Sequence, residues 1–155
     1  MNSSNNDGFF PPDTGRSLPM ALLRTREIVM ERFRPVLSSH NVTEQQWRVL
    51  RVLSEVGEME ASQLAVRACI LAPSLTRIIK TLEAGELITS CKDKEDGRRT
   101  LLAIDKKGKK LIALVTPECC THYADIEAAF GHDEMEDLLD KLDELQKLLR
   151  GCRKK

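Results

Sequence analysis

Apolar residues recur at spacings of three and four over residues 17–39, which is the pattern of a helix with one buried side. Ser17 stands at a capping position and Pro19 falls in the first turn, as at many helix starts. Pro35 is expected to bend or end the regular part. Because the apolar stripe is wide, the pattern predicts a long helix that packs against two surfaces at once.

Two further helices follow. Thr43 and Gln46 have the spacing of a capping box, and Val42 and Trp47 have that of a hydrophobic staple. These signals predict a helix that begins after Thr43 and ends at Gly57. The apolar spacing predicts a short third helix over residues 61–68.

The stretch 71–83 predicts a fourth helix with two chemically different sides. Pro73 suits a first helical position, and Gly85 is a stop signal. One side is apolar and consists of Leu75, Ile78, Ile79 and Leu82. The other side carries small, hydroxylated and basic residues, namely Ser74, Thr76, Arg77 and Lys80. A helix that lies in the major groove of DNA requires such a surface, although an ordinary solvated helix could also carry it.

A hairpin is predicted directly after this helix. Residues 87–91 and 100–104 form two short apolar stretches, and a polar turn with Gly97 and Arg98-Arg99 joins them. A hairpin with arginines at its tip has the form of a wing that enters a minor groove. Two short helices followed by such a hairpin predict a mainly α protein with a small β-hairpin wing, that is, a winged helix-turn-helix domain.

Long helices flank this domain. Asp105 is expected to cap a fifth helix, in which Pro117 should produce a kink. A last helix is expected from about Asp133, with an apolar seam of Met135, Leu138, Leu142, Leu145 and Leu149. The pattern predicts a flexible N-terminal arm (1–16), dimerisation helices (17–40 and 105–150) and a DNA-binding domain (41–104). A two-fold homodimer would read the two half-sites of a palindrome.

Charge is distributed unevenly although the formal net charge is zero. Residues 67–110 contain 11 Lys and Arg against 6 Asp and Glu, a difference of +5. Residues 118–146 contain one Lys against 10 Asp and Glu, a difference of −9. This asymmetry suggests that the basic region meets phosphate, whereas the acidic region faces water or a partner.

Several classes of protein are disfavoured. The five cysteines include no CxxC pair, so neither a zinc site nor a disulfide framework is expected, and no cofactor is expected. His40, His122 and His132 are scattered, and the chain has no HExxH, no GxSxG and no glycine-rich phosphate loop, so an enzyme is not expected. Without an apolar span or a signal-peptide pattern, the expected location is the cytoplasm, with no membrane partner.

The chain resembles the MarR family of bacterial transcription regulators over residues 17–150. The hairpin Asp93-x-x-Asp96-x-Arg98-Arg99, followed by a strand and Asp105-x-x-Gly108, is similar to the wing and helix entry of that family. Asp105 departs from the Thr that the family commonly has there. Segments 18–24, 33–35, 43–50 and 71–77 resemble the subgroup that controls homoprotocatechuate (4-hydroxyphenylacetate) degradation.

This resemblance implies a dimeric repressor that a small aromatic carboxylate releases from a palindromic double-stranded operator, with control of aromatic-acid catabolism. Arg98 would enter the minor groove with Asp96 orienting it, and Arg99 is its neighbour in the chain. The residues expected to contact DNA are Ser62, Gln63, Ser74, Thr76, Arg77, Lys80, Asp96, Arg98 and Arg99.

An effector site is also expected from the residues and the resemblance. Arg24 lies among apolar neighbours, where it could bind a carboxylate or pair with Glu27 or an acid of the last helix. Trp47 could stack on an aromatic acid, form the staple, or do both. The candidate effector residues are Met20, Arg24, Met30, His40, Trp47 and Arg48. A carboxylate that clamps Arg24 to the second helix would change the distance between the two recognition helices.

A thiol-based redox sensor is the alternative function. Cys69 lies in an apolar segment, where a buried and inert thiol is expected. Cys119 and Cys120 are adjacent and close to Pro117. The alternative repressor would therefore respond to oxidation at Cys69 or at Cys119 and Cys120.

Overall fold

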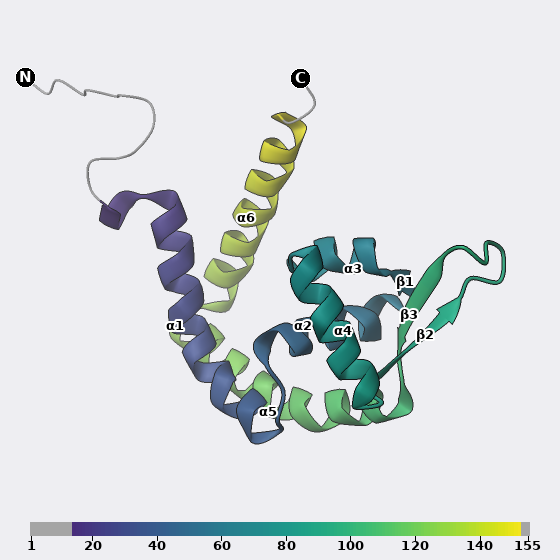
Figure 1. Cartoon of the computed structure of the whole chain (residues 1–155). Helices are drawn as coiled ribbons and strands as arrows, with labels where there is room; N and C mark the ends of the chain where they lie inside the picture. The colour runs from purple at the N-terminus through teal and green to yellow at the C-terminus, as the bar shows by residue number, and fades with distance from the viewer. Residues whose placement is uncertain (1–13, 153–155) are drawn as a thin grey trace, which may run out of the picture. The chain divides into compact units, whose positions relative to one another are not determined.

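The computed structural model describes residues 14–152, which divide into two compact units, one up to residue 115 and the other from residue 116 onward. Each unit is described by itself. The elements, in chain order, are η1 (Thr14–Arg16), α1 (Leu18–Ser39), α2 (Glu44–Val56), β1 (Met59–Glu60), α3 (Ala61–Arg67), α4 (Ala72–Ala84), β2 (Ile88–Lys92), β3 (Thr100–Ile104), α5 (Lys106–Phe130) and α6 (His132–Cys152) (Figure 1). Residues 1–13 of the arm expected over 1–16 lie outside the described residues, and Thr14–Arg16 form a 3₁₀ turn.

The start of α1 is close to the prediction, but its cap differs. Ser17 is the N-cap residue and is buried, yet its side chain makes no capping hydrogen bond. Pro35 lies inside the helix, which continues to Ser39. The helix ends where Asn41 adopts a left-handed conformation (φ 56°).

The capping box of α2 is confirmed. The backbone N–H of Thr43 donates to Gln46 Oε1 at 2.9 Å, and the N–H of Gln46 donates to Thr43 Oγ1 at 3.2 Å. Gly57 ends the helix with φ 86°, a conformation that favours glycine. Both ends of α2 therefore follow from local sequence.

Helices α3 and α4 form the predicted pair with small shifts of their ends. Ala68 caps α3, and Pro73 occupies the second rather than the first position of α4 because Ala72 precedes it in the helix. Gly85 caps α4 with an ordinary φ of −81°. The left-handed conformation falls on the next residue, Glu86, at φ 58°.

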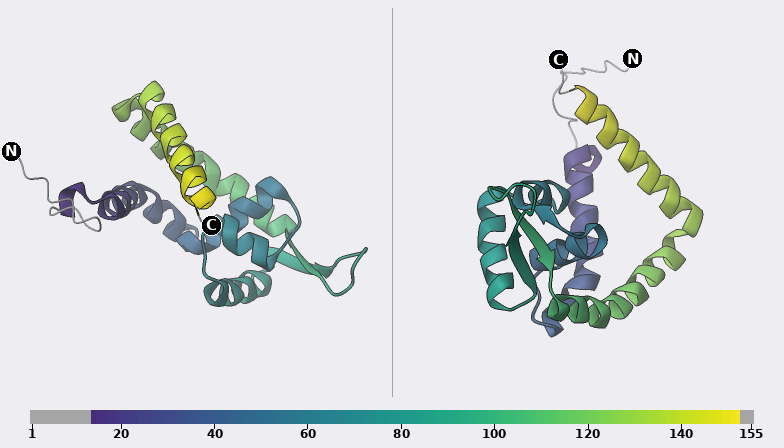
Figure 2. Two further views of the ribbon diagram at one scale, coloured as in Figure 1. Left: turned by 90° about the horizontal axis from the view of Figure 1, so that it is seen from above. Right: turned by 90° about the vertical axis from the view of Figure 1, so that its right-hand side faces the viewer.

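The predicted hairpin is present and belongs to a three-stranded antiparallel sheet of order β1-β3-β2. In the hairpin Ile88 pairs with Ile104 and Lys92 with Thr100, while Met59 of β1 pairs with Leu102 of β3. The loop of the hairpin extends away from the helices of this unit in both Figure 1 and Figure 2. The strand β1 was not predicted, because two residues are too few to show a period.

One aliphatic core joins these helices to the sheet. It is formed by buried residues of α2, α3, α4, the strands and the start of α5, among them Val49, Leu50, Leu53, Leu64, Leu75, Leu82, Ile88, Leu102 and Ile112. Because α4 and the hairpin share this core, the helix predicted to read DNA and the wing are held in one body.

In the second unit, Gly131 (φ 108°) separates α5 from α6. Helix α6 begins at His132, so Asp133 lies in its first turn rather than at its cap. The apolar seam remains partly open: Leu138 is 39% exposed and Leu149 is 59% exposed. Helix α5 continues through Pro117. No helix within residues 14–152 combines the length and apolar character needed to cross a bilayer.

Candidate nucleic-acid interface and effector residues

The outward side of α4 has the predicted composition, but one hydroxyl group is already engaged. Thr76, Arg77 and Lys80 are exposed, and Ser74 is half-buried. The Oγ1 of Thr76 donates to the carbonyl oxygen of Ala72 at 3.1 Å within the helix. Arg77 and Lys80 therefore supply the charged part of this surface.

In α3 the two residues predicted to contact DNA differ in whether their side chains take part in the capping of the helix. Ser62 and Gln63 are both exposed. The Oε1 of Gln63 accepts a hydrogen bond from the backbone N–H of Glu60 at 3.4 Å and so closes a capping box at the start of the helix. Ser62 takes no part in this capping box. Its side chain is therefore the better placed of the two to contact another molecule.

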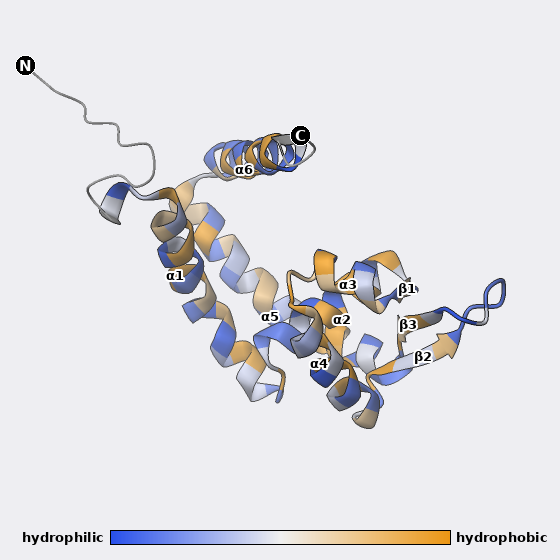
Figure 3. Ribbon diagram, turned by 45° about the horizontal axis from the view of Figure 1, so that its top comes forward, coloured by the Kyte–Doolittle hydropathy of each residue, from blue (hydrophilic) through white to orange (hydrophobic). Residues whose placement is uncertain are grey.

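At the wing, the side chain of Arg98 extends into solvent, and Asp96 accepts hydrogen bonds from its backbone and from its guanidinium group. The side chain of Arg98 is 94% exposed, and its Nε donates to Asp96 Oδ1 at 3.3 Å. The backbone N–H of Arg98 donates to the same oxygen at 3.1 Å. The expected ion pair between Asp96 and Arg98 is present, and the whole loop is hydrophilic (Figure 3).

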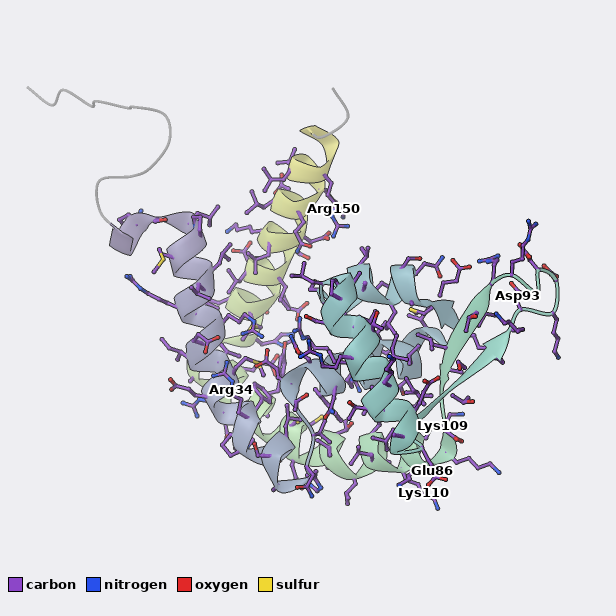
Figure 4. The ribbon with its side chains drawn as sticks, in the orientation of Figure 1. Arg34, Glu86, Asp93, Lys109, Lys110 and Arg150 are labelled. Carbon is purple, nitrogen blue, oxygen red and sulfur yellow. The ribbon has the colours of Figure 1, made fainter. Side chains whose placement is uncertain are left out.

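Arg99 is directed back toward the body of the domain. Its Nε donates to the carboxylate of Glu60, and one of its terminal nitrogens lies 3.6 Å from a carboxylate oxygen of Asp93, which Figure 4 labels where the loop of the hairpin begins. The hydrogen bond to Glu60 is the main reason that the pKa of Arg99 is raised. The adjacent arginines therefore point to different partners, which the sequence did not indicate.

The predicted effector residues do not form one pocket within a single chain. Arg24 is exposed, whereas Trp47 and Arg48 are half-buried, as are Met20, Met30 and His40. Arg24 lies in α1 and His40 caps its end, so at about 1.5 Å per residue they are separated by roughly 24 Å. One chain can therefore contribute only part of the set to any one small molecule.

Glu27, one of the acids expected to pair with Arg24, forms ion pairs with other arginines instead. Glu27 accepts hydrogen bonds from Arg34 at 2.8 Å and from Arg26 at 3.0 Å. The bond from Arg34 is the main cause that lowers the pKa of Glu27. Arg26 and Arg34 of α1 also pair with Glu44 at the start of α2, and Figure 4 labels Arg34. These ion pairs tie α1 to α2.

Arg48 has a structural partner that the sequence did not reveal. One terminal nitrogen of its guanidinium donates to the carbonyl oxygens of Ala68 at 2.8 Å and Cys69 at 3.0 Å. Its Nε is buried without a hydrogen-bond partner. Burial is the main reason that the pKa of Arg48 is lowered. Arg48 thus holds the turn that leads into α4.

A cleft of about 550 Å³ lies in the first unit, where the ends of α1 and α4 meet the start of α5. Its lining is His40, Asn41, Val42, Gly85, Leu87, Lys107, Lys110, Leu111 and Leu114, and it contains one of the six predicted effector residues, His40. Lys107 lies 3.6 Å from Glu86, and Glu86 and Lys110 are labelled in Figure 4. A lining that combines apolar side chains with Lys107 and Lys110 suits an amphipathic anion.

The cysteines differ from expectation in one respect. Cys69 is exposed rather than buried, and it occupies the α3–α4 turn in a left-handed conformation (φ 51°). Cys120 is exposed and Cys119 is half-buried. Within residues 14–152, no three His, Cys, Asp or Glu side chains are grouped so that they could hold a metal ion.

Comparisons with known proteins agree with this architecture. A model of the MarR family matches residues 42–100. The HTH-type transcriptional regulator FarR of Neisseria gonorrhoeae is 40% identical over 132 residues, which cover 85% of this chain and 90% of FarR. The homoprotocatechuate degradative operon repressor of Escherichia coli is 41% identical over 128 residues, covering 83% of this chain and 86% of that protein.

Among solved structures, NadR in complex with 4-hydroxyphenylacetate superposes with a TM-score of 0.80 at 37% identity. The similarity covers 88% of this chain and 99% of NadR. Family model, sequence relatives and fold all lead to transcriptional regulators and not to enzymes. The chain therefore belongs to the MarR family of winged helix-turn-helix transcriptional regulators.

Proposed function

We propose that this chain is a homodimeric repressor that binds a palindromic operator and leaves it when a small aromatic carboxylate binds. The observation that carries the proposal is the likeness to NadR, which was crystallised with 4-hydroxyphenylacetate, over nearly the whole of both chains. The similarity to a repressor of a homoprotocatechuate operon supports the same class of effector and a role in aromatic-acid catabolism.

Operator binding is assigned to α4 and the wing. Arg77 and Lys80 provide cations on the outward side of α4, and Arg98 provides one at the tip of the hairpin. Because α4 and the hairpin share one core, these groups could contact DNA together, with the helix in the major groove and Arg98 in the adjacent minor groove. Salt-dependent binding is expected, because phosphate contacts release counterions.

Dimer formation is assigned to the long helices, over residues 17–40 and 105–150. Helix α1 exposes Leu23 to 52% and Ile28 to 63%, and α6 exposes Leu148 to 61%. Such apolar surface on helices with little core of their own favours burial against a second copy of the chain. Two copies would then present two recognition helices to two half-sites.

Arg24 is the preferred anchor for the effector carboxylate. Its neighbours Arg26 and Arg34 are held by Glu27 and Glu44, whereas Arg24 is exposed on the same helix. The ion pairs of Arg26 and Arg34 with Glu44 place the start of α2 beside α1, so the aromatic ring would meet Trp47 of α2, whereas His40 lies too far along α1 to reach the same ligand. If the effector binds the DNA-free protein more tightly than the DNA-bound protein by about 1–3 kcal/mol, it would weaken operator binding roughly 5- to 150-fold.

The test is fluorescence anisotropy of a labelled duplex taken from DNA upstream of the gene. Protein is titrated at two salt concentrations, after which 4-hydroxyphenylacetate, phenylacetate, indoleacetate and benzoate are added in turn. We expect tight, salt-sensitive binding that one acid releases, and loss of that release in Arg24→Ala. Lys110→Ala is the matched variant for the separate cleft at the start of α5.

The outcomes separate the parts of the proposal. A normal response of Arg24→Ala to every active acid would show that Arg24 is not the anchor. Loss of the response in Lys110→Ala alone would move the effector to the cleft lined by His40 and Lys110. Failure of the wild-type protein to bind this duplex or any duplex selected from a random pool would reject the operator-binding function itself.

A redox-sensing repressor is the second candidate, and the exposure of Cys69 in the turn before α4 favours it. Oxidation at this position would add polar bulk next to the helix proposed to read DNA. Peroxide should then release the wild-type protein from the duplex, whereas Cys69→Ser should stay bound. Cys119→Ser and Cys120→Ser provide the matched test of the adjacent pair, and release by an acid but not by peroxide would reject this candidate.

A further inference from the structure

The most exposed large hydrophobic side chain among the described residues belongs to Leu71, at 79% exposed. Leu71 is also the N-cap residue of α4 and makes no side-chain capping hydrogen bond. It lies directly before the part of the helix that is proposed to enter the major groove. The connection between α3 and α4 that contains it is apolar along its length (Figure 3).

The fold alone does not account for leucine at this position. Ser, Thr, Asp and Asn are preferred at the N-cap, because their oxygen atoms accept a hydrogen bond from the first turn of the helix. Leucine offers no acceptor, and its exposure leaves apolar surface in water. A residue that breaks two local preferences at a solvent-exposed position indicates a contact outside the monomer.

The neighbouring side chains have the same character. Ala72 and Pro73 are exposed, and Val66 of α3 is 70% exposed on the other side of the turn. Because the Oγ1 of Thr76 donates its proton to the carbonyl oxygen of Ala72, its hydroxyl group can only accept from an outside partner, and the methyl group beside it remains available for an apolar contact. The leading edge of α4 therefore offers methyl groups, and the cations Arg77 and Lys80 follow along the helix.

We propose that Leu71, together with Ala72 and the methyl group of Thr76, reads thymine methyl groups in the major groove of the operator. The C5-methyl group of thymine is the one apolar group that a base pair presents in this groove, and apolar side chains are its usual partners. The adjoining cations match the phosphates on either side, which favours DNA over a protein as the occupant of this surface. The proposal rests on the proposed function, because it requires that α4 bind operator DNA.

The experiment replaces thymine by deoxyuridine, which removes the methyl group and leaves the base pairing unchanged. Full-length protein first selects its best duplex from a random pool, and each thymine of the selected half-site is then replaced in turn. Burial of one methyl group corresponds to roughly a fourfold change in affinity. When both half-sites are replaced at the contacted position, we expect binding by the wild-type protein to weaken roughly 15-fold.

Two variants assign the effect to Leu71. In Leu71→Ala, binding to the thymine duplex should weaken, and replacement at one particular position should have no further effect while other positions keep theirs. Leu71→Ser adds a capping oxygen, so it should unfold at a higher temperature than the wild-type protein and yet bind the thymine duplex more weakly. This pair of opposite changes excludes loss of folding as the cause.

Lys80→Ala is the control for a residue that contacts phosphate and does not read a base. It should weaken binding to thymine and deoxyuridine duplexes equally and lower the salt dependence. If the wild-type protein binds DNA but every deoxyuridine substitution has the same effect on wild type and Leu71→Ala, the methyl-reading proposal is wrong and the operator-binding function stands. If no duplex is selected at all, both fail together.

Discussion

The guanidinium group of Arg99, where the loop of the hairpin joins β3, donates to the carboxylate of Glu60, the residue that precedes α3. The sheet register brings them together, because Glu60 of β1 pairs with Leu101 of β3, two positions after Arg99. Asp93, where the loop leaves β2, is a second partner of Arg99 at 3.6 Å. This ion pair joins the wing to the helix-turn-helix, whereas the neighbouring Arg98 extends into solvent.

If the ion pair between Glu60 and Arg99 fixes the position of the wing, we expect Glu60→Gln and Arg99→Ala to weaken operator binding to a similar degree. A direct contact of Arg99 with phosphate predicts the opposite for Glu60→Gln, since loss of a negative charge near DNA should preserve or strengthen binding. Anisotropy with the selected duplex distinguishes the two by the sign of the change. Thermal stability should change little, because exposed ion pairs contribute little to folding.

Arg98→Ala is expected to weaken operator binding roughly 5- to 150-fold, the range that corresponds to loss of one specific arginine contact. Because its side chain is 94% exposed, the variant should unfold at the same temperature as the wild-type protein. Asp96→Ala should produce a smaller loss, since it releases the guanidinium without removing it. Equal binding by wild type and Arg98→Ala in the anisotropy titration would exclude the wing tip from the interface.

Local features of this chain were predictable and contacts between distant segments were not. The capping box of Thr43 and Gln46 was found because both hydrogen bonds lie within four residues. The hydrogen bonds from Arg48 to the α3–α4 turn and from Arg99 to Glu60 span 20 residues and more, so no spacing rule could indicate them.

The same limit applies to the candidate site. Hydrophobic spacing predicted which residues of α4 face outward, because a helix fixes its own sides. It could not predict that the six effector residues are distributed along the length of α1 and beyond it. It also could not predict that Cys69 is exposed, because the apolar composition of a turn does not fix which of its side chains face the core: Ala68 and Ile70 on either side of Cys69 are buried.

Arg48→Met should lower the free energy of unfolding by about 1–3 kcal/mol, since it removes charge-assisted hydrogen bonds to two carbonyl oxygens and keeps much of the side-chain packing. Arg51→Met is the matched control on the same helix, because Arg51 makes only an exposed pair with Glu55 four residues later. Urea denaturation at one protein concentration compares the two. Equal stability of both variants would show that Arg48 does not hold the turn.

Gly108 lies where the first turn of α5 passes the end of α4. An added Cβ would lie 2.2 Å from the carbonyl oxygen of Leu87 and 2.7 Å from Ile104 Cγ1. Overpacking of this kind costs about 1–3 kcal/mol, and alanine gains about 1 kcal/mol over glycine in a helix. We expect Gly108→Ala to be less stable than the wild-type protein in urea denaturation. Gly151→Ala is the control in α6, where nothing lies within 4 Å, and a stabilised Gly108→Ala would contradict the close contact.

His132, the first residue of α6, is expected to titrate above its ordinary pKa of 6.5. The main cause is its hydrogen bond to Glu127, and the negative charge of Glu127 adds to it. Because the pKa is raised in the folded chain, the pair stabilises fully below about pH 6.5, and this contribution is lost as the pH rises through the higher folded pKa. The chain has three histidines, so proton NMR can follow each imidazole, with His132→Asn assigning the signal. Glu127→Gln should lower the pKa of His132 and should reduce the melting temperature more at pH 6 than at pH 8. A wild-type His132 signal that titrates at or below 6.5, or one that Glu127→Gln leaves unchanged, would show that the pair does not form in solution.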